Sequence, residues 1–278
     1  MVRTGGTAEG ARVVDTEHLR VERHGGTMVV TLNRPESKNA FSLPMLVGLY
    51  DAWLAADAED DIRSIVLTGA GGAFCAGMDL KALAGGTFGD SALRGRLEAD
   101  PDLHWKAMLR HHRPRKPLIA AVEGVCVAGG TEIIQGTDIR VAGESASFGL
   151  FEVRRGLFPL GGSTVRLSRQ IPYTHAMEML LTGRRYTAAE ALAIGLIGKV
   201  VPDGEALKHA LDLARQINEA APLSVEAVKR SVLETLDMDE EAGLARELAI
   251  GQEVFKSEDA KEGPRAFAEK RTPVYRRR

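Results

Sequence analysis

The sequence is poor in cysteine and has no long apolar run, and each scarcity excludes a class of protein. Only Cys75 and Cys126 occur among 278 residues, so we expect no disulfide framework, and a reducing compartment such as the cytoplasm fits. Both lie in apolar or glycine-flanked stretches, where a cysteine is usually a small buried residue. No apolar run reaches the roughly 18 residues that a membrane-spanning helix needs. Residues 1–12 lack the apolar core of a secretion signal and are expected to form a flexible polar tail.

A strong charge of either sign is also missing. The formal net charge is −2 and the isoelectric point is near 6.4, which gives no general attraction to nucleic acid or to anionic lipid. Two cationic runs, residues 110–116 and 276–278, keep nucleic-acid binding open as an alternative function, but few aromatic side chains accompany them. The adjacent His111 and His112 lack the further ligands that a metal site needs. We therefore expect no metal, no nucleic-acid partner and no membrane partner.

Hydrophobic periodicity predicts an α/β core. Alternating apolar residues on both sides of Gly25 and Gly26 predict a β-hairpin. Apolar residues three and four positions apart predict an amphipathic helix over residues 43–56. Strand, helix and strand then recur around residues 118 and 139, which gives a repeated ββα pattern without a dividing linker.

The end of the chain is predicted to be helical. Thr187 and Glu190 have the spacing of a capping box, and glycines follow several of the periodic segments. The expected helices cover residues 173–182, 188–194, 203–220, 223–236 and 240–255. We accordingly divide the chain into a tail (1–12), an α/β core that carries the site (13–200) and a C-terminal helical region (201–278).

Two strand-to-glycine junctions are the most informative stretches. A buried strand at residues 118–122 leads to Gly129, Gly130 and the first turns of a helix that carries Glu132, and a β-branched strand at residues 64–68 leads to a glycine-rich loop. Backbone N–H groups at a helix N-terminus have no partner inside the helix, and the helix dipole favours negative charge there. Each junction could therefore supply one N–H to an anion or a developing oxyanion.

Other glycine motifs do not fit. The loop after residue 68 begins like a dinucleotide fingerprint, but Phe74 stands where the third glycine is needed. No Gly-Lys-Ser/Thr follows any glycine loop, which excludes a P-loop. Ser163 lacks the flanking glycines of a nucleophile elbow and is better interpreted as a residue at the start of a helix.

The two junctions resemble those of the enoyl-CoA hydratase/isomerase family, the crotonase superfamily. Residues 73–80 (AFCAGMDL) and 124–132 (GVCVAGGTE) carry the resemblance. Further matching segments follow in order at residues 33–35, 39–41, 156–162, 181–183, 195–197 and 266–270. The resemblance spans residues 21–271. It implies an α/β fold with a crotonase-like ββα spiral core and a C-terminal helical region that mediates assembly into a homotrimer or a dimer of trimers.

The resemblance also implies a chemistry. Family members bind acyl-CoA thioesters and stabilise an enolate at the thioester oxygen with two backbone N–H groups, which fall here on Ala76 and Gly129. Hydratases use two glutamates, and both positions are filled, by Glu132 and Glu152. Two carboxyls in one water-poor pocket cannot both ionise easily, so one can donate a proton while the other accepts one. We expect Glu132 to act mainly as the base and Glu152 mainly as the proton donor, with no cofactor, since coenzyme A is part of the substrate.

The remaining site residues follow from the resemblance. The coenzyme A site is expected to include Lys38, Ala40, Met78, Asp79, Leu80, Phe267 and Lys270, the last two from the C-terminal helix of a neighbouring subunit. The acyl pocket is expected to include Leu83, Trp105, Leu157 and Phe158. Residues 84–102 are rich in Gly, Asp and Ala and are expected to be mobile, as lids often are.

The predicted function is hydration of the 2,3 double bond of an enoyl-CoA thioester. Double-bond isomerisation, thioester hydrolysis and decarboxylation are the alternatives within the superfamily. Residues 130–138 and 261–267 also resemble an actinobacterial subgroup associated with sterol side-chain breakdown. A bulky steroid acyl group and a simple fatty enoyl chain both stay open as substrates.

Overall fold

A computed structural model of the chain describes residues 16–81 and 91–278. Its main sheet has six strands in the order β1-β2-β3-β4-β6-β9. These strands are β1 (Leu19–His24), β2 (Thr27–Leu32), β3 (Ser64–Gly69), β4 (Leu118–Val122), β6 (Ile139–Gly143) and β9 (Lys199–Val201). Only β1 and β2 pair antiparallel, through the predicted hairpin, and every other neighbouring pair is parallel.

Both faces of the main sheet are buried. On one face, Val30, Ile65 and Ala120 belong to the large core that also contains Trp53 of α1 (Leu43–Ala58). On the other, alternate residues such as Val29, Val66 and Ile119 pack against small residues of α9 (Ala206–Glu219). Strands covered on both faces are nearly continuous apolar runs, as parallel sheets require. Ser42 caps α1, because its side chain accepts a hydrogen bond from the Met45 N–H.

A smaller sheet adjoins the main one and carries the second glycine junction. Its strands, in the order β5-β7-β8, are β5 (Val125–Val127), β7 (Ser147–Gly149) and β8 (Tyr186–Thr187). The short helix α5 (Gly129–Ile134) starts just after β5, and the 3-10 helix η2 (Glu152–Arg155) follows β7. Because β5 and β7 are parallel neighbours, the segments that carry Glu132 and Glu152 leave the same end of this sheet.

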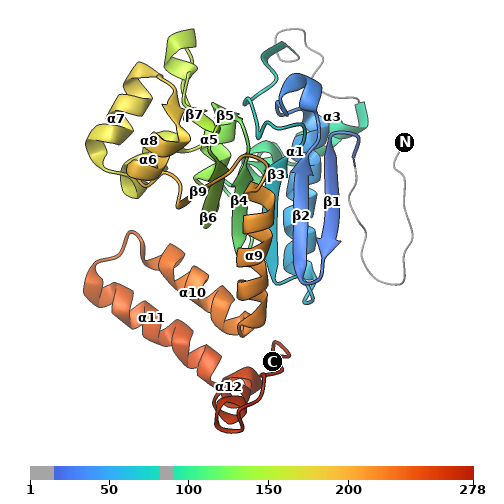
Figure 1. Cartoon of the computed structure of the whole chain (residues 1–278), viewed down its shortest axis with the longest axis vertical. Coiled ribbons are helices and arrows are strands. Elements are labelled where there is room, and N and C mark those ends of the chain that lie inside the picture. The colour runs from blue at the N-terminus through green and yellow to red at the C-terminus, as the bar shows by residue number, and fades with distance from the viewer. Residues whose placement is uncertain (1–15, 82–90) are drawn as a thin grey trace.

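The shorter helices are η1 (Pro35–Ser37), α3 (Ser91–Ala99), α4 (Leu103–Ala107), α6 (Ser163–Gln170), α7 (Tyr173–Thr182) and α8 (Ala188–Ala193). Of these, α6, α7 and α8 lie beside the smaller sheet, and α3 lies beside α1 (Figure 1). The capping box at Thr187 and Glu190 is confirmed, and α7 has the predicted bounds. The second half of the segment expected to be mobile, residues 84–102, contains the helix α3, whose Leu97 packs with Leu43 and Leu103, and its mobility stays a prediction. Residues 82–90 of that segment lie outside the described residues.

The helical end of the chain divides into two parts. The predicted boundary at residue 200 falls inside β9, and α9 covers the main sheet, so α9 is part of the core. The helices α10 (Pro222–Thr235), α11 (Glu240–Phe255) and α12 (Glu258–Ala268) extend away from the sheets (Figure 1). No helix within the described ranges is long and apolar enough to cross a bilayer.

Candidate active site

The two glycine junctions lie side by side. The Phe74 and Cys75 N–H groups donate to the Val125 carbonyl, and the Val127 N–H donates back to the Cys75 carbonyl at 2.9 Å. The loop after β3 is thereby fixed along β5. Two residues after Cys75, a Cβ built on Gly77 would lie 3.1 Å from the Gly129 nitrogen. The backbone after Gly77 and the start of α5 therefore meet, as predicted.

The N–H donor predicted in the first junction is wrong. The Ala76 N–H donates to the Lys38 carbonyl at 3.0 Å, so this donor is already used inside the fold. The Phe41 N–H donates to the Gly77 carbonyl, and the Asp79 N–H donates to the Phe41 carbonyl. This pattern turns the Met78 N–H away from residue 41, and it has no hydrogen-bond partner in the structure as described. Met78, expected only as a coenzyme A contact, takes the position predicted for Ala76.

The second donor is at the start of α5. Gly129 is the first residue of this helix, so its N–H has no acceptor within the helix. Ala128 precedes it with φ 50° and ψ −125°, a conformation rarely adopted by a residue with a side chain. The Ala128 N–H donates to the Gly149 carbonyl at 2.7 Å, which fixes this turn to β7. Met78 and Gly129 thus supply two adjacent backbone donors of the kind that stabilises an oxyanion.

Glu132 is a buried carboxyl one turn into α5. Only 5% of its surface is exposed, and burial, together with the charge of Glu152, raises its pKa to about 7. Hydrogen bonds from Ser163 and from the Gly161 backbone lower the pKa of Glu132 and so offset part of this rise. Near neutral pH this carboxyl can therefore both hold and release a proton.

Glu152 opens η2 on the neighbouring segment. Burial raises its pKa as well, while a backbone hydrogen bond and the charge of Arg155 lower it. Its Oε2 atom is buried without a hydrogen-bond partner among the described residues, as expected for a group that acts on a bound molecule. The pKa values of both carboxyls are thus raised by burial, and the charge of Glu152 contributes to the raised pKa of Glu132. The assignment of Glu132 as base and Glu152 as donor stays a prediction.

The loop of residues 34–41 brings part of the expected coenzyme A site together. Arg34 is the centre of this loop: its Nη1 donates to the Ala40 carbonyl at 2.8 Å and to Oδ2 of Asp79 at 3.0 Å. Lys38 is exposed and adjoins the Ala76 amide. The loop of residues 34–41 and the segment of residues 78–80 therefore lie together, and they contain Lys38, Ala40, Met78, Asp79 and Leu80. The Asp79 carboxylate accepts hydrogen bonds from Arg34 and so stabilises this loop, a role the sequence did not indicate.

The two C-terminal residues expected at the same site lie elsewhere. Phe267 belongs to α12, and Lys270 follows this helix. The helix is at the far end of the molecule from α5 (Figure 1). The Phe267 side chain is 87% exposed. Within one chain these residues do not reach the glycine junctions, so their contribution stays a proposal that requires a second subunit.

Of the four residues expected in the acyl pocket, Phe158 lines a cavity, and the pocket itself stays a prediction. Phe158, Leu160 and Arg166 line a cavity of about 240 Å³ that also borders Gly162. Trp105 packs against the core and stacks with Arg110, another residue of this cavity, at 5.0 Å from the ring centre. Leu157 is 49% exposed beside it, and Leu83 lies outside the described residues.

The two cysteines are structural. Cys75 and Cys126 are paired residues of an isolated β-bridge, both are free and buried, and burial raises the pKa of both thiols, that of Cys75 to about 12. A thiol in this state is a poor nucleophile. The interpretation of both as small buried residues is confirmed.

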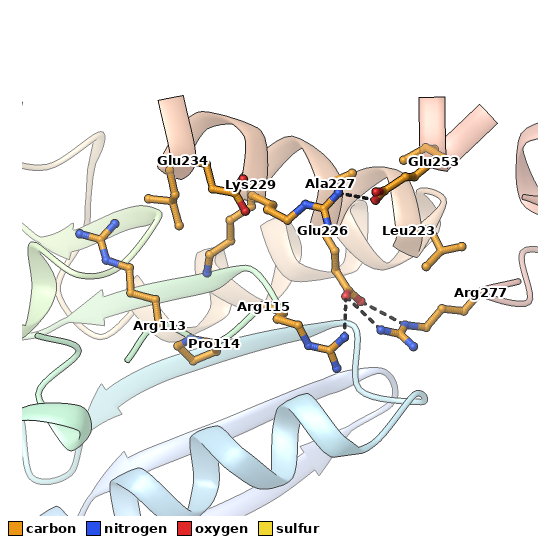
Figure 2. Close-up of a pocket in the computed structure, with 13 residues that line it drawn as sticks. Arg113, Pro114, Arg115, Leu223, Glu226, Ala227, Lys229, Glu234, Glu253 and Arg277 are labelled. Carbon is orange, nitrogen blue, oxygen red and sulfur yellow. Dashed lines mark hydrogen bonds and ion pairs between the residues drawn. The ribbon is translucent and has the colours of Figure 1, made fainter. Parts of the chain in front are cut away.

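The cationic runs face each other across a second cavity of about 400 Å³ (Figure 2). Arg115, Lys116 and Arg277 all lie within 3.7 Å of the Glu226 carboxylate. Figure 2 shows Arg115 and Arg277 converging on Glu226 from opposite sides. Because nucleic-acid binding depends on cations that are free to neutralise phosphates, this pairing argues against such a role. In residues 16–81 and 91–278 no group of three or more His, Cys, Asp or Glu side chains is placed to hold a metal ion.

Comparison with known proteins identifies the family. The model of the family described as "Enoyl-CoA hydratase/isomerase" matches residues 22–278. The chain belongs to this family. It is 55% identical over 258 residues to "Enoyl-CoA hydratase EchA19" of Mycobacterium tuberculosis, covering 93% of this chain and 96% of that protein. It is 38% identical to "Carnitinyl-CoA dehydratase" of Salmonella arizonae, covering 94% and 99%.

Solved structures agree with this membership. A crystal structure of an enoyl-CoA hydratase from Mycobacterium tuberculosis has a TM-score of 0.86 and 39% identity, covering 95% of this chain and all of that one. The predicted family and the crotonase-type α/β fold with C-terminal helices are therefore confirmed, and the chain is an enzyme of this family.

Proposed function

We propose that the protein is an enoyl-CoA hydratase that adds water across the 2,3 double bond of an enoyl-CoA thioester. The observation that carries the proposal is the position of two carboxyls, the buried Glu132 and the partly buried Glu152, on segments that leave the same end of the β5-β7 pair. Both have raised pKa values, and the charge of Glu152 acts on Glu132. A single acid would suffice for isomerisation, whereas addition of water needs one group to activate the water and one to protonate the α-carbon.

The backbone donors account for the other half of the mechanism. Addition of hydroxide at Cβ moves negative charge to the thioester oxygen. The Met78 and Gly129 N–H groups would donate to that oxygen, and the dipole of α5 favours charge at the same point. Glu132 would take the proton of the attacking water, and Glu152 would deliver one to Cα. The product is a 3-hydroxyacyl-CoA, and the carboxyls exchange their protonation states until solvent restores them. No redox step occurs, so we propose that no cofactor is required.

For the acyl group, we propose a bulky substrate, up to a steroid side chain. Support comes from the exposure of Leu157 and of Phe158, 49% and 61%, where Phe158 lines the cavity that also borders Gly162. A narrow pocket for a short chain would bury such residues more completely. A panel of enoyl-CoA thioesters of increasing size tests this, and a kcat/KM that falls steadily with size would contradict it.

We also propose a homotrimer, or a dimer of trimers, in the cytoplasm. The outward faces of α10 and α11 expose large apolar side chains, among them Val228, Val232, Leu244 and Leu248, each more than half exposed. Apolar surface of this extent is typical of a subunit interface. In such an assembly Phe267 and Lys270 would reach the coenzyme A of a neighbour. Sedimentation equilibrium tests the assembly, and a monomer at micromolar concentration would contradict it.

The reaction is tested with the two glutamine variants. Glu132→Gln and Glu152→Gln should each lower the hydration rate about 10²–10⁴-fold, while the binding of a saturated acyl-CoA persists. Mass spectrometry of the product separates the alternatives: gain of one water indicates hydration, no change isomerisation, loss of coenzyme A hydrolysis, and loss of carbon dioxide decarboxylation. Wild-type rates in both variants would refute the assignment.

A further inference from the structure

Ser163 lies directly against the Glu132 carboxyl. It is the first residue of α6 and only 1% of its surface is exposed. Its backbone N–H is 3.5 Å from Oε1 of Glu132. The other carboxylate oxygen, Oε2, is held from a second side, since a Cβ built on Gly161 would be 2.6 Å from it. The turn before α6 therefore surrounds this carboxyl.

Gln135 controls the direction of the Ser163 hydroxyl. Its Nε2 donates to Oγ of Ser163 at 2.8 Å and to the Thr131 carbonyl at 3.0 Å. Because the hydroxyl oxygen already accepts from Gln135, its own proton is directed elsewhere. The adjacent Glu132 carboxyl is the group toward which this proton can point, and the Ser163 side chain lowers the pKa of Glu132.

Gln135 is itself fixed in place. It is 1% exposed, it lies one turn after Thr131, and its backbone carbonyl accepts from Nε2 of Gln170 at 2.9 Å. Its side-chain amide is held through Nε2, which contacts both the Thr131 carbonyl and the Ser163 hydroxyl.

We propose that Ser163 is a positioning residue for Glu132: its hydroxyl, oriented by Gln135, donates to the carboxylate and keeps it ionised and aligned to activate water. The role of Glu132 as the base rests on the proposed function, whereas the contact itself does not. Ser163 contacts the base and not the substrate. The chain Gln135–Ser163–Glu132 thus connects the centre of the fold with the reacting water.

Two other charged groups, Glu152 and Arg166, interact electrostatically with Glu132 and must stay unchanged in the test. Glu152, on η2, raises the pKa of Glu132. Arg166, one turn after Ser163 on α6, is within electrostatic reach of the same carboxyl. Replacement of Ser163 leaves both in place, so a change in titration after the replacement reports the hydroxyl.

The test compares Ser163→Ala with Ser168→Ala. Ser168 is an exposed serine on the same helix, and its hydroxyl contacts only the Val165 carbonyl at 3.5 Å, so its replacement controls for the loss of a hydroxyl. In Ser163→Ala the acidic limb of the kcat–pH profile should move about one pH unit upward, as expected when a carboxylate loses one hydrogen bond. On that limb the rate falls about tenfold at a given pH. The KM should change little, and Gln135→Met should move the limb in the same direction by less.

A second measurement does not depend on activity. The carboxyl carbon of Glu132, followed by NMR during a pH titration of labelled protein, should show the same upward shift in Ser163→Ala and none in Ser168→Ala. An unchanged titration in a folded Ser163→Ala protein would overturn the proposal. If the wild-type protein hydrates no enoyl-CoA while the titration still shifts, the proposed function fails and the Ser163 contact stands.

Discussion

Both terminal nitrogens of Arg34 lie 3.0 Å from Oδ2 of Asp79, and this contact joins two loops that are 45 residues apart in the chain. Met78, a proposed oxyanion donor, immediately precedes Asp79. The position of its N–H therefore depends on an ion pair whose side chains are only about 15% exposed. Sheltered pairs of this type are more sensitive to the loss of one partner than exposed ones.

Arg34→Lys should weaken both binding and catalysis. A lysine keeps the charge but cannot donate to Asp79 and to the Ala40 carbonyl at once, since it lacks the planar fork of donors. We expect KM for the acyl-CoA to rise and kcat to fall, each roughly tenfold, because one missing hydrogen bond to a charged group is worth about 1.5–3 kcal/mol. Steady-state kinetics measures both. Arg20→Lys, on the exposed side of β1, is the control, and equal kinetics for the two variants would contradict the prediction.

Gly161→Ala should displace the Glu132 carboxyl. The added methyl group would lie 2.6 Å from Oε2 and 2.9 Å from Cβ of Glu132, and the glycine φ is not in the left-handed region, so contact with Glu132 is the main effect. We expect kcat to fall about 10²-fold, as for a misplaced catalytic group. Gly198→Ala is a matched control, because a methyl group there meets only the Arg140 carbonyl at 3.7 Å. A thermal melt separates the kinetic effect from unfolding.

Ala128→Gly should stabilise the protein. Ala128 adopts φ 50° and ψ −125°, which costs of the order of 1–3 kcal/mol for a residue with a Cβ. Glycine avoids this strain. Its greater conformational freedom in the unfolded chain lowers the stability by about 0.5–1 kcal/mol, which offsets part of the gain. The net gain in the free energy of unfolding should be about 1 kcal/mol, measurable by urea denaturation. A lower midpoint for Ala128→Gly would show that the turn carries no strain.

Stability should depend on the ionisation of Glu132. Folding raises its pKa from 4.5 to about 7, so between these values the folded state binds more protons than the unfolded chain. The free energy of unfolding therefore falls as pH rises through this window. Each pKa unit corresponds to about 1.4 kcal/mol, so the cost reaches roughly 3 kcal/mol above pH 7.

Glu132→Gln removes this cost. The variant should be more stable than the wild-type protein at pH 8, and the difference should vanish near pH 4.5. Denaturation at several pH values tests it, with Glu152→Gln as a comparison that should show the same sign. A variant less stable than wild type at pH 8 would mean that the lost hydrogen bonds outweigh the charge.

Most of the fold could be predicted because its signals are local. The hairpin at Gly25 and Gly26, the capping box at Thr187 and the periodic run of α1 each depend on neighbouring residues. The helix α3 in the segment before α4 was not predicted, because a composition rich in Gly, Asp and Ala gives no helical signal. The burial of α3 residues against Leu43 is a tertiary contact that composition does not reveal.

The site was predictable to the level of motifs but not of single atoms. The sequence located both glycine junctions and both glutamates, since their residue types and spacing are distinctive. It chose the wrong amide, Ala76, because the acceptor of that N–H is the carbonyl of Lys38, which only the fold brings near. The interpretation of Ser163 as a residue at the start of a helix is confirmed. Its contacts with Gln135 and Glu132 were not predicted, because these partners are 28 and 31 positions away.

The burial of the Cys75 and Cys126 thiols has a practical consequence for anyone who studies this enzyme. The backbones of the two residues pair in a β-bridge, and both free thiols are screened from reagents by their burial. Alkylating compounds should leave the native protein active, and labelling of either thiol would instead report that the two strands had separated. Each thiol is thus a natural probe for opening of the centre of the fold.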